Sequence, residues 1–470
     1  MKADIVIVGA GPAGLAAAAK AASLSARVLL LDENDKPGGR VLSHRCDTEQ
    51  SALWLSQSER LDTLLAAVSR HKDNIKIMHG VTVWGKDPHG ALLLSSNDAN
   101  APSTVKGDAY ILANGALETI VPFPGWTLPG IFTLGGLNSL IRNDVIPGKR
   151  IVVAGTGPLL FALLDNLLAR GCHIAALIQS VPLQKTLNNI GGVIAGLDKE
   201  KAGILYRCVK GIMARRIKHF QSHIVSGAIR QNDHLRVHVS PIDRQWKQKQ
   251  DKGIKIETDI LAVSYGLRPS IDLAHMVGCK IHYDTDLGYW RMLHDPMLET
   301  SQPRVFVAGD NSQVCGYAAA EQQGKLAAIS AGMSLGLTTL KAVRAEVRDL
   351  QQKIDRLRVF GRALDKLAQP GPALWDAITD DCIICRCESV TLADIKQAGS
   401  ETVCDINDLK RRTRTGMGYC QGRYCGQIVN EMLWHHTEFA GQRQLFSARL
   451  PLKPVTFATI AGYKNDDRHI

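Results

Sequence analysis

The sequence predicts an α/β protein built from two dinucleotide-binding domains and a small helical domain near the C-terminus. Three observations support this prediction. A pattern of strand, glycine-rich turn, helix and second strand occurs twice, over residues 4–32 and over residues 150–179. Six of the eleven cysteines fall close together near the C-terminus. The 470 residues are too many for one hydrophobic core, so two or three domains are expected.

The first pattern has every part of a dinucleotide-binding site. Residues 4–8 form a β-branched run typical of a buried strand, and a second strand ends at Asp32, which can accept hydrogen bonds from a ribose. The glycines between them permit a tight turn, close approach of a pyrophosphate and close packing of helix on strand. The N-terminus of the helix offers free N–H groups to phosphate. A fold of this kind with an empty or repurposed site is the alternative. The expected contacts are Gly9, Gly11, Pro12, Ala13, Gly14, Asp32 and Glu33.

Two later segments resemble the FAD motifs of glutathione-reductase-like flavoproteins. Residues 37–40 read Pro-Gly-Gly-Arg, which resembles the loop that passes over the flavin diphosphate in those proteins. Far downstream, a strand ends in Gly309 and Asp310, which resembles the second FAD motif, whose Asp holds the ribityl chain. The resemblance implies a glutathione-reductase-like fold in which residues 1–120 and 281–335 together bind FAD. It adds these cofactor contacts: Gly39, Arg40, Gly309 and Asp310.

The second pattern, within residues 121–280, predicts a nucleotide-binding domain that has lost its nucleotide. The turn keeps two glycines, but Leu160 stands where a working NAD site has Gly or Ala. Gln179 stands where such a site normally has an acid for the ribose. We therefore favour a degenerate domain kept for packing, and NADH held by backbone contacts alone stays open as the alternative. No Cys-x-x-Cys or Cys-x4-Cys pair precedes Cys382, which argues against a disulfide reductase.

Four cysteines in two short loops predict an iron–sulfur site within residues 381–435, after a helix and linker (336–380) and before a C-terminal tail (436–470). The spacing is Cys-x-Cys, 32 intervening residues, and Cys-x4-Cys. A [2Fe–2S] cluster suits this spacing because each iron takes two sulfur ligands. A structural zinc more usually takes two Cys-x-x-Cys knuckles, so zinc and unliganded thiols are the lesser alternatives. Lys and Arg residues beside the second pair would raise the potential of the anionic cluster. The expected ligands are Cys385, Cys387, Cys420 and Cys425, and Cys382 and Cys404 fall outside the set.

Composition and charge narrow the class of protein. Hydrophobic residues make up 45% and charged residues 21%, as in globular proteins. The sequence has neither an apolar run long enough to cross a bilayer nor a basic-then-apolar leader, so we expect a cytoplasmic protein. The net charge is +11, and most of it lies in residues 201–260, which contain 13 Lys and Arg against 5 Asp and Glu. This segment has no nucleic-acid-binding motif. We interpret this segment as a solvated basic face, with an acidic protein partner second and nucleic acid a distant third.

The C-terminal motif over residues 413–425, Thr-Arg-Thr-Gly-Met-Gly-Tyr-Cys-Gln-Gly-Arg-Tyr-Cys, resembles the bacterioferritin-associated-ferredoxin-like [2Fe–2S] domain. Residues 122–130, the altered second glycine turn and Pro-Leu-Lys-Pro at 451–454 extend the resemblance over the whole chain. The sequence is therefore similar to the α subunit of the heteromeric FAD/[2Fe–2S] amine dehydrogenases. That family includes opine dehydrogenase, D-hydroxyproline and proline dehydrogenases, and hydrogen cyanide synthase.

This resemblance implies an electron-transfer subunit of an amine or amino-acid dehydrogenase. A β subunit with its own FAD would oxidise the substrate, and a small ferredoxin-like γ subunit completes some of these complexes. A quinone or carrier protein, rather than O2 or NAD, would take the electrons. Some relatives hold ATP in the N-terminal site, so ATP is the alternative to FAD there. For the location, peripheral attachment to a membrane is the alternative to a purely cytoplasmic protein. The competing functions are a stand-alone NAD(P)H:acceptor oxidoreductase and a non-catalytic nucleotide-binding scaffold. No residue is predicted to act as a catalytic acid or base.

Overall fold

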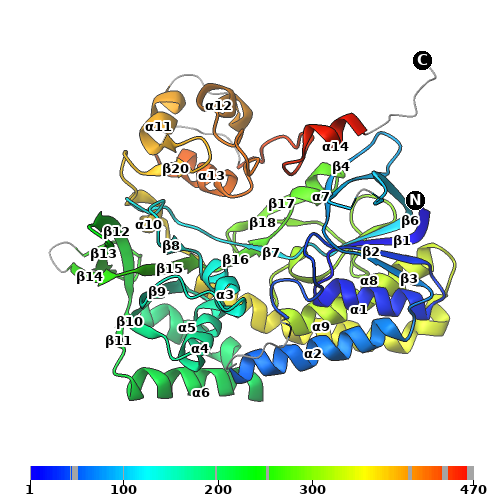
Figure 1. Ribbon diagram of the computed structural model, residues 1–470, viewed down its shortest axis with the longest axis horizontal. Helices are drawn as coiled ribbons and strands as arrows, with labels where there is room; N and C mark the ends of the chain where they lie inside the picture. Colours follow the sequence, from blue (N-terminus) through cyan, green and yellow to red (C-terminus); the bar gives the residue numbers. More distant parts are fainter. Residues whose placement is uncertain are drawn as a thin grey trace.

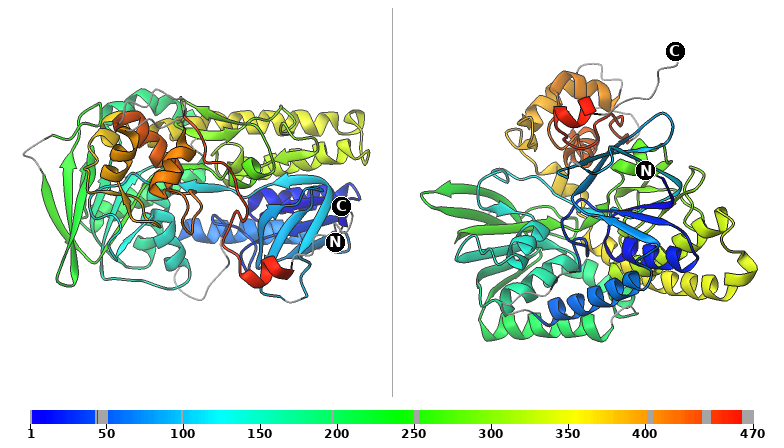
Figure 2. Two further views of the ribbon diagram at one scale, coloured as in Figure 1. Left: turned by 90° about the horizontal axis from the view of Figure 1, so that it is seen from above. Right: turned by 45° about the vertical axis from the view of Figure 1, so that its right-hand side comes forward.

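The computed structural model describes residues 2–42, 44, 51–98, 100–195, 198–249, 253–400, 405–436 and 443–462. Two α/β units lie side by side, and a small helical bundle covers one side of the pair (Figure 1). In the view from above, the bundle, drawn in orange, lies over the unit drawn mainly in cyan and green (Figure 2). Cys46 and Cys404 lie outside the described residues.

The first unit is built on a seven-stranded sheet in the order β3-β2-β1-β6-β5-β4, with β19 paired to β6. Its strands are β1 (Lys2–Val8), β2 (Val28–Leu31), β3 (Ile75–Met78), β4 (Val81–Lys86), β5 (Leu92–Ser96), β6 (Thr104–Leu112) and β19 (Val305–Val307). The β1 strand is apolar on both faces because both faces are covered. In the parallel register, Val8 aligns with Leu31 and with Leu112, and Val307 also aligns with Leu112. The carboxyl ends of these strands therefore meet at one edge, where such sheets bind ligands.

Four long helices cover one face of this sheet. They are α1 (Pro12–Ser23), α2 (Ala52–Ser69), α8 (Tyr317–Ser334) and α9 (Leu340–Ala368). The α8 helix packs between α1 and α9, and the alanine-rich surfaces of α1 and α8 allow close contact. The short 3-10 helix η1 (Gly309–Asn311) connects β19 to the loop before α8.

The second unit has a parallel five-stranded sheet in the order β11-β10-β9-β15-β8, flanked by helices and by an antiparallel three-stranded sheet. The parallel strands are β8 (Ile131–Phe132), β9 (Arg150–Thr156), β10 (His173–Gln179), β11 (Lys218–Gln221) and β15 (Ile260–Tyr265). The helices are α3 (Leu134–Arg142), α4 (Pro158–Ala169), α5 (Leu183–Ala195) and α6 (Lys199–Ala214). The antiparallel strands are β12 (His223–Gln231), β13 (His234–Pro241) and β14 (Ile254–Thr258).

Short elements join the two units and carry the bundle. Two antiparallel pairs and a short helix lie at the joint: β7 (Ala116–Glu118) with β16 (Leu267–Pro269), β17 (Ile281–Asp284) with β18 (Tyr289–Met292), and α7 (Asp272–Met276). The bundle and the segments beside it contain α10 (Pro372–Asp376), β20 (Ile383–Cys385), β21 (Val390–Thr391), α11 (Leu392–Ser400), α12 (Ile406–Thr413), α13 (Cys425–His436) and α14 (Phe457–Gly462). The α11, α12 and α13 helices pack on one another. Their apolar core is continuous with that of the second unit.

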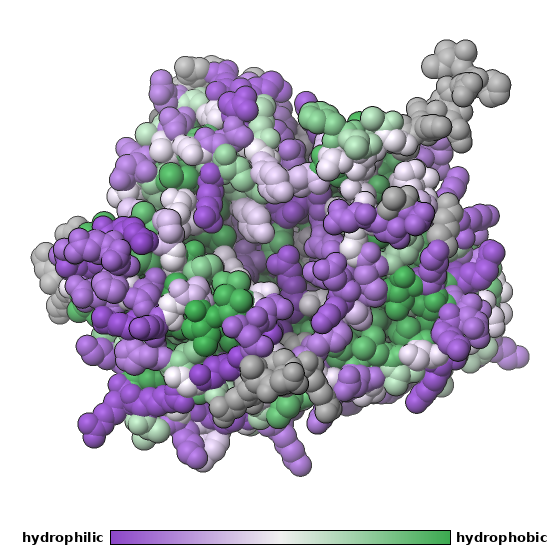
Figure 3. All heavy atoms as spheres, viewed as in Figure 1, coloured by the Kyte–Doolittle hydropathy of each residue, from purple (hydrophilic) through white to green (hydrophobic). Residues whose placement is uncertain are grey.

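Within the described ranges, no helix has the length and apolar character needed to cross a membrane. Hydrophilic residues are spread over much of the face shown in Figure 3, and apolar groups lie between them rather than in one continuous band.

Candidate functional site

The first glycine turn forms a cradle of backbone at the carboxyl edge of the first sheet. Gly9 has a φ of +106°, and a Cβ there would collide with the Ala113 carbonyl. A Cβ at Gly14 would collide with the Gly9 carbonyl, so α1 can follow β1 this closely only with glycine at both positions. The helix begins at Pro12, and no side-chain hydrogen bond caps it at Gly11. Its first N–H groups therefore stay available for a phosphate.

The two acids that follow β2 have different surroundings. The buried Asp32 carboxylate accepts a hydrogen bond from the Ala10 N–H, so it lies directly against the glycine turn. Glu33 forms an ion pair with Lys453 of the C-terminal segment. Burial raises the pKa of Glu33, but the charge and hydrogen bond of Lys453, together with the charges of Arg40 and Arg423, outweigh burial, and the pKa falls below its ordinary value. Sequence reasoning did not identify Lys453 as a contact of this site.

The Pro37–Arg40 loop lies over the first glycine turn. Gly39 approaches Gly11 so closely that a Cβ on Gly39 would lie 3.0 Å from the Gly11 Cα. Arg142, at the end of α3 in the second unit, donates to the Arg40 carbonyl at 3.2 Å. Burial lowers the pKa of Arg142 to about 10. The loop is therefore held in place by a residue of the other unit, which the sequence pattern did not indicate.

Asp310 reaches the same edge from the distant strand β19. Its carboxylate accepts hydrogen bonds from the N–H groups of Cys315, at 2.9 Å, and Gly316, at 3.0 Å. Burial raises the pKa of Asp310. A Cβ at Gly324 would collide with the Ala13 carbonyl, so the middle of α8 lies directly against the first turn of α1.

Buried polar atoms around η1 point to a polar ligand. In the described part of the chain, three side-chain atoms there have no hydrogen-bond partner: Asn311 Oδ1, Gln313 Nε2 and Gln323 Nε2. An unpaired buried polar atom costs about 1–3 kcal/mol. A dinucleotide such as FAD fits this sheet edge, which combines the glycine turn, the uncapped N–H groups of α1 and the unpaired polar atoms.

The second glycine turn has a similar backbone, but other parts of the chain cover it. Gly157 has a φ of +86°, and a Cβ there would lie 3.6 Å from the Cβ of Ala368 at the end of α9. The Thr156 hydroxyl donates to the Ala368 carbonyl at 2.8 Å. Leu160 is buried in the core, and the side chain of Gln179 hydrogen-bonds to a histidine of β11. The end of α9 thus lies where the phosphates of a nucleotide would approach this turn.

Asp365, in the last turn of α9, makes this packing sensitive to pH. The Tyr289 hydroxyl donates to its carboxylate at 2.6 Å, and burial raises the pKa of Asp365 from 3.8 to about 8. The folded chain holds this proton more tightly than the unfolded chain, so the contribution to stability is largest below pH 4 and is lost as the pH rises toward 8.

We expect Asp365→Asn to remove this pH dependence, since the amide oxygen can still accept the Tyr289 hydrogen bond. The variant should gain stability relative to the wild type by up to about 1.4 kcal/mol for each pH unit between 4 and 8. Thermal unfolding across this pH range measures the gain. Asp349→Asn, an exposed position on the same helix, is the control and should show no such trend. An equal difference at every pH would contradict the prediction.

The structure brings the four predicted cysteines together. Cys385 ends β20, Cys387 follows in the turn, and Cys420 precedes Cys425, which begins α13. The Cys425 thiol hydrogen-bonds to Cys385 and to Cys420, and Cys420 also lies against Cys387. The hydrogen bond from Cys425 lowers the pKa of Cys385 to about 6 and that of Cys420 to about 5. Thiolates are the form that binds iron.

The two cysteine pairs supply four sulfur donors, the number that a [2Fe–2S] cluster takes. A [2Fe–2S] cluster needs only two cysteines at each iron, so the donor set fits that group better than a four-ligand zinc site. Cys382 lies outside the set in the apolar core, where burial raises its pKa to about 12.

Glycines and an aromatic ring shape the second cysteine loop. A Cβ at Gly418 would collide with the Cβ of Cys387, so the loop can lie against the first cysteine pair only with glycine there. Gly416 and Gly422 have positive φ angles, and both face the ring of Phe446. A Cβ at Gly416 would lie 2.8 Å from that ring. Phe446 comes from the C-terminal segment, which sequence reasoning treated only as a tail.

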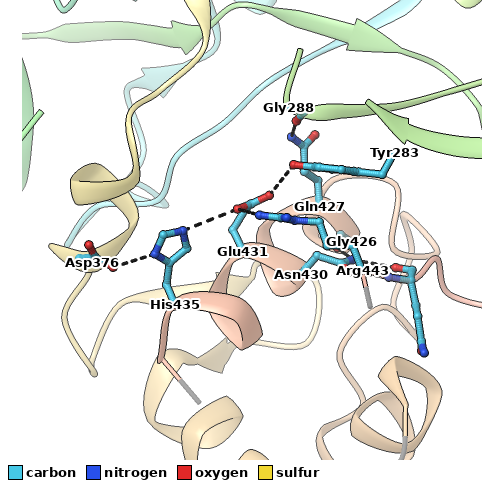
Figure 4. A network of polar contacts seen from close by, with 10 residues as sticks. Tyr283, Gly288, Asp376, Gly426, Gln427, Asn430, Glu431, His435 and Arg443 are labelled. Carbon is cyan, nitrogen blue, oxygen red and sulfur yellow. Dashed lines mark hydrogen bonds and ion pairs between the residues drawn. The ribbon is translucent and has the colours of Figure 1, made fainter. Parts of the chain in front are cut away.

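A polar network fixes the bundle to the body (Figure 4). The Tyr283 hydroxyl of β17 donates to Glu431 of α13 at 3.0 Å, and Arg443 donates to the same carboxylate at 3.0 Å. The Gln427 amide donates to the Gly288 carbonyl at 2.8 Å. Buried, charge-assisted contacts of this kind hold a defined geometry. The network therefore attaches α13, which begins at Cys425, to the β17–β18 hairpin.

A second contact lies between the cysteine loop and the Asp310 edge. Arg268 belongs to β16, which contacts η1. Its guanidinium donates to the Arg423 carbonyl and lies within electrostatic reach of Cys425. Burial lowers the pKa of Arg268, and the nearby Asp272 carboxylate opposes this effect. Arg268 therefore lies between the predicted flavin site and the predicted cluster, a position that its sequence neighbours did not reveal.

The chain is similar in sequence to known proteins. Residues 3–325 match the pyridine nucleotide-disulphide oxidoreductase family, and residues 383–435 match the BFD-like [2Fe-2S] binding domain. The HcnB subunit of hydrogen cyanide synthase from Pseudomonas protegens is 32% identical over 97% of both chains. An opine oxidase subunit from Rhizobium meliloti is 28% identical over 97% of this chain and 98% of its own. The names of both relatives describe them as subunits of an enzyme.

Solved structures show the same fold. The crystal structure of L-proline dehydrogenase from P. horikoshii aligns with a TM-score of 0.68 at 20% identity, over 98% of this chain and 80% of that one. The chain therefore belongs to the pyridine nucleotide-disulphide oxidoreductase family, as a flavin-dependent oxidoreductase with FAD, a C-terminal [2Fe–2S] domain and relatives in hydrogen cyanide synthase and opine oxidase.

Proposed function

We propose that this chain is the electron-transfer subunit of a heteromeric dehydrogenase that oxidises the C–N bond of an amine or amino-acid-type substrate. The substrate, an opine, hydroxyproline or proline-like compound, would react on a partner β subunit with its own FAD. The observation that carries the proposal is the fixed joint between the Asp310 edge and the four cysteines, with Arg268 between them. The names of the relatives support the heteromeric assembly.

In this proposal the chain's own residues bind and orient the two redox groups. The first glycine turn, the Pro37–Arg40 loop and Asp310 hold FAD, and the two cysteine loops hold the [2Fe–2S] cluster. FAD supplies the change between two-electron and one-electron transfer, and the cluster accepts single electrons. The polar network of Figure 4 supports this arrangement, because it attaches the bundle with the cysteine loops to the β17–β18 hairpin of the body. A quinone or carrier protein would accept the electrons, and a small ferredoxin-like γ subunit would complete the complex.

The proposal predicts that NADH does not reduce this protein. The end of α9 lies on the second glycine turn, and Lys185 donates to the Gln369 carbonyl at 2.7 Å just beyond it. A nucleotide would have to displace this buried packing before it could reach the backbone. In a stopped-flow experiment, excess NADH should leave the flavin absorption of the purified chain unchanged, and dithionite should bleach it. Rapid bleaching by NADH without a partner would favour a stand-alone NAD(P)H oxidoreductase instead.

The substrate side can be tested on the native complex. The chain should co-purify from its host with a second flavoprotein subunit, and candidate amines should reduce the cluster only when that subunit is present. Reduction is followed by the electron paramagnetic resonance signal of the cluster. An intact complex in which a substrate reduces the partner flavin and never the cluster would exclude the proposed electron-transfer role.

A further inference from the structure

The cluster site has one edge at the protein surface. Of the four cysteines, Cys385 and Cys425 are buried and Cys420 is partly covered, whereas Cys387 is exposed. The backbone of Gly418 lies against the Cβ of Cys387, and Tyr419 is the next residue in the chain. Tyr419 is 79% exposed. This ring contributes little to packing within the described fold, and an exposed ring is informative when further apolar side chains accompany it.

Apolar and cationic side chains surround this edge. Met417 and Tyr424 of the same loop are also exposed large hydrophobic residues. The exposed cations are Arg386, Arg411, Arg412 and Arg414, from the first cysteine loop and from the end of α12. Two carboxylates face them: Glu388 pairs with Arg414, and Asp408 pairs with Arg411 and Arg412. Among the described side chains named here, four arginines against two acids leave an excess of two positive charges.

This combination has the character of a transient docking site. A small apolar centre with a charged rim is typical of weak electron-transfer encounters, which bury little area and depend on charge for speed. A positive rim selects partners of negative charge, since like charges repel at the encounter. The exposed sulfur at the centre would give such a partner the shortest path to the cluster.

We propose that this Cys387 edge, defined by Cys387, Met417, Tyr419, Tyr424 and the four arginines, is the docking site of an acidic one-electron carrier protein. The inference rests on the proposed function and names the chemistry of its electron acceptor. Each encounter moves one electron from the cluster to the carrier, so the cluster is oxidised and the carrier is reduced by one electron. No covalent bond forms and no proton is transferred.

The test uses two probe proteins that both accept single electrons and differ in charge. The chain is reduced with dithionite, freed of excess reductant and mixed in a stopped-flow instrument with acidic plant plastocyanin or with basic cytochrome c. The second-order rate constant for plastocyanin should be the larger at low salt and should fall as salt is added. Arg411→Glu and Tyr419→Ala should each lower the plastocyanin rate constant by roughly tenfold or more, within the range of electrostatic steering.

Matched variants far from the edge separate docking from general damage. Arg348→Glu on α9 and Tyr206→Ala on α6 change the same residue types at other exposed positions, and both should keep the wild-type rate constants. The visible spectrum of the cluster, which does not depend on docking, shows that each variant is intact. Equal rate constants for the two probes at low salt, or no loss in Arg411→Glu and Tyr419→Ala, would overturn the docking proposal.

A failure of the docking proposal can be distinguished from a failure of the proposed function. If a substrate of the native complex fails to reduce the cluster while dithionite succeeds, the proposed function is wrong, whatever the carriers do. If the substrate reduces the cluster and the two carriers do not differ, the proposed function stands and the docking site is wrong.

Discussion

Cys425→Ser is expected to abolish electron flow through this chain while leaving the flavin reducible. Cys425 contacts both Cys385 and Cys420, so it connects the two cysteine loops at their buried side. A serine oxygen is a much poorer iron ligand than a thiolate, and a cluster with three cysteines would be lost or unstable. The measurements are iron and acid-labile sulfide content, the visible spectrum of the cluster, and reduction of an external acceptor by the native complex.

Two further variants make this prediction specific. Cys382→Ser changes a thiol of similar burial in the same bundle, and it should keep both iron and activity. Cys387→Ser changes the exposed ligand, where a loss of folding is least expected, and it should lose the cluster as Cys425→Ser does. Full iron content in Cys387→Ser would show that the ligand set is wrong. Full electron flow in a variant without iron would favour the scaffold interpretation.

The parts of the site that the sequence predicted are those with strict local requirements. The Gly9 and Gly14 positions could be assigned because any Cβ there collides with backbone, and such constraints leave a fixed spacing in the sequence. The cysteine spacing is informative for the same reason, since metal ligands tolerate little substitution. Asp310 was predicted from its own Gly-Asp motif, nearly 300 residues after the first glycine turn, and the parallel register of β19 with β6 places it at the same edge as that turn.

The remaining contacts depend on how distant segments meet. Arg142 reaches the Pro37–Arg40 loop from another unit, and Phe446 closes the cysteine loop from the C-terminal segment. Neither residue stands out in its local sequence, because an arginine at a helix end and a phenylalanine in a tail are ordinary there. Nothing in the local sequence indicated that the end of α9 packs on the second glycine turn. The sequence indicated a degenerate turn through Leu160, but only packing places Ala368 on it.

Arg268→Gln is expected to make the cluster harder to reduce and to slow electron transfer from flavin to cluster. A reduced cluster carries one more negative charge, and the guanidinium beside Cys425 stabilises that charge in a region partly shielded from water. Removing the cation should move the reduction potential of the cluster to a more negative value. Loss of a group of this kind beside a metal site typically costs roughly 10- to 100-fold in activity. Potentiometric titration of the electron paramagnetic resonance signal measures the shift.

The potential distinguishes an electrostatic role for Arg268 from a purely structural one, because the same guanidinium also donates a hydrogen bond to the Arg423 carbonyl. Arg268→Lys keeps the charge but loses the planar, multiply donating group, so it should restore most of the potential even if it unfolds more readily. Arg291→Gln, which removes an arginine paired with Asp284 on the adjacent hairpin, is the matched control and should leave the potential unchanged. If the glutamine and lysine variants have the same potential as the wild type and differ only in stability, Arg268 only holds the bundle in place. A negative shift in the glutamine variant alone would instead establish that the joint tunes the cluster to accept electrons from the flavin side.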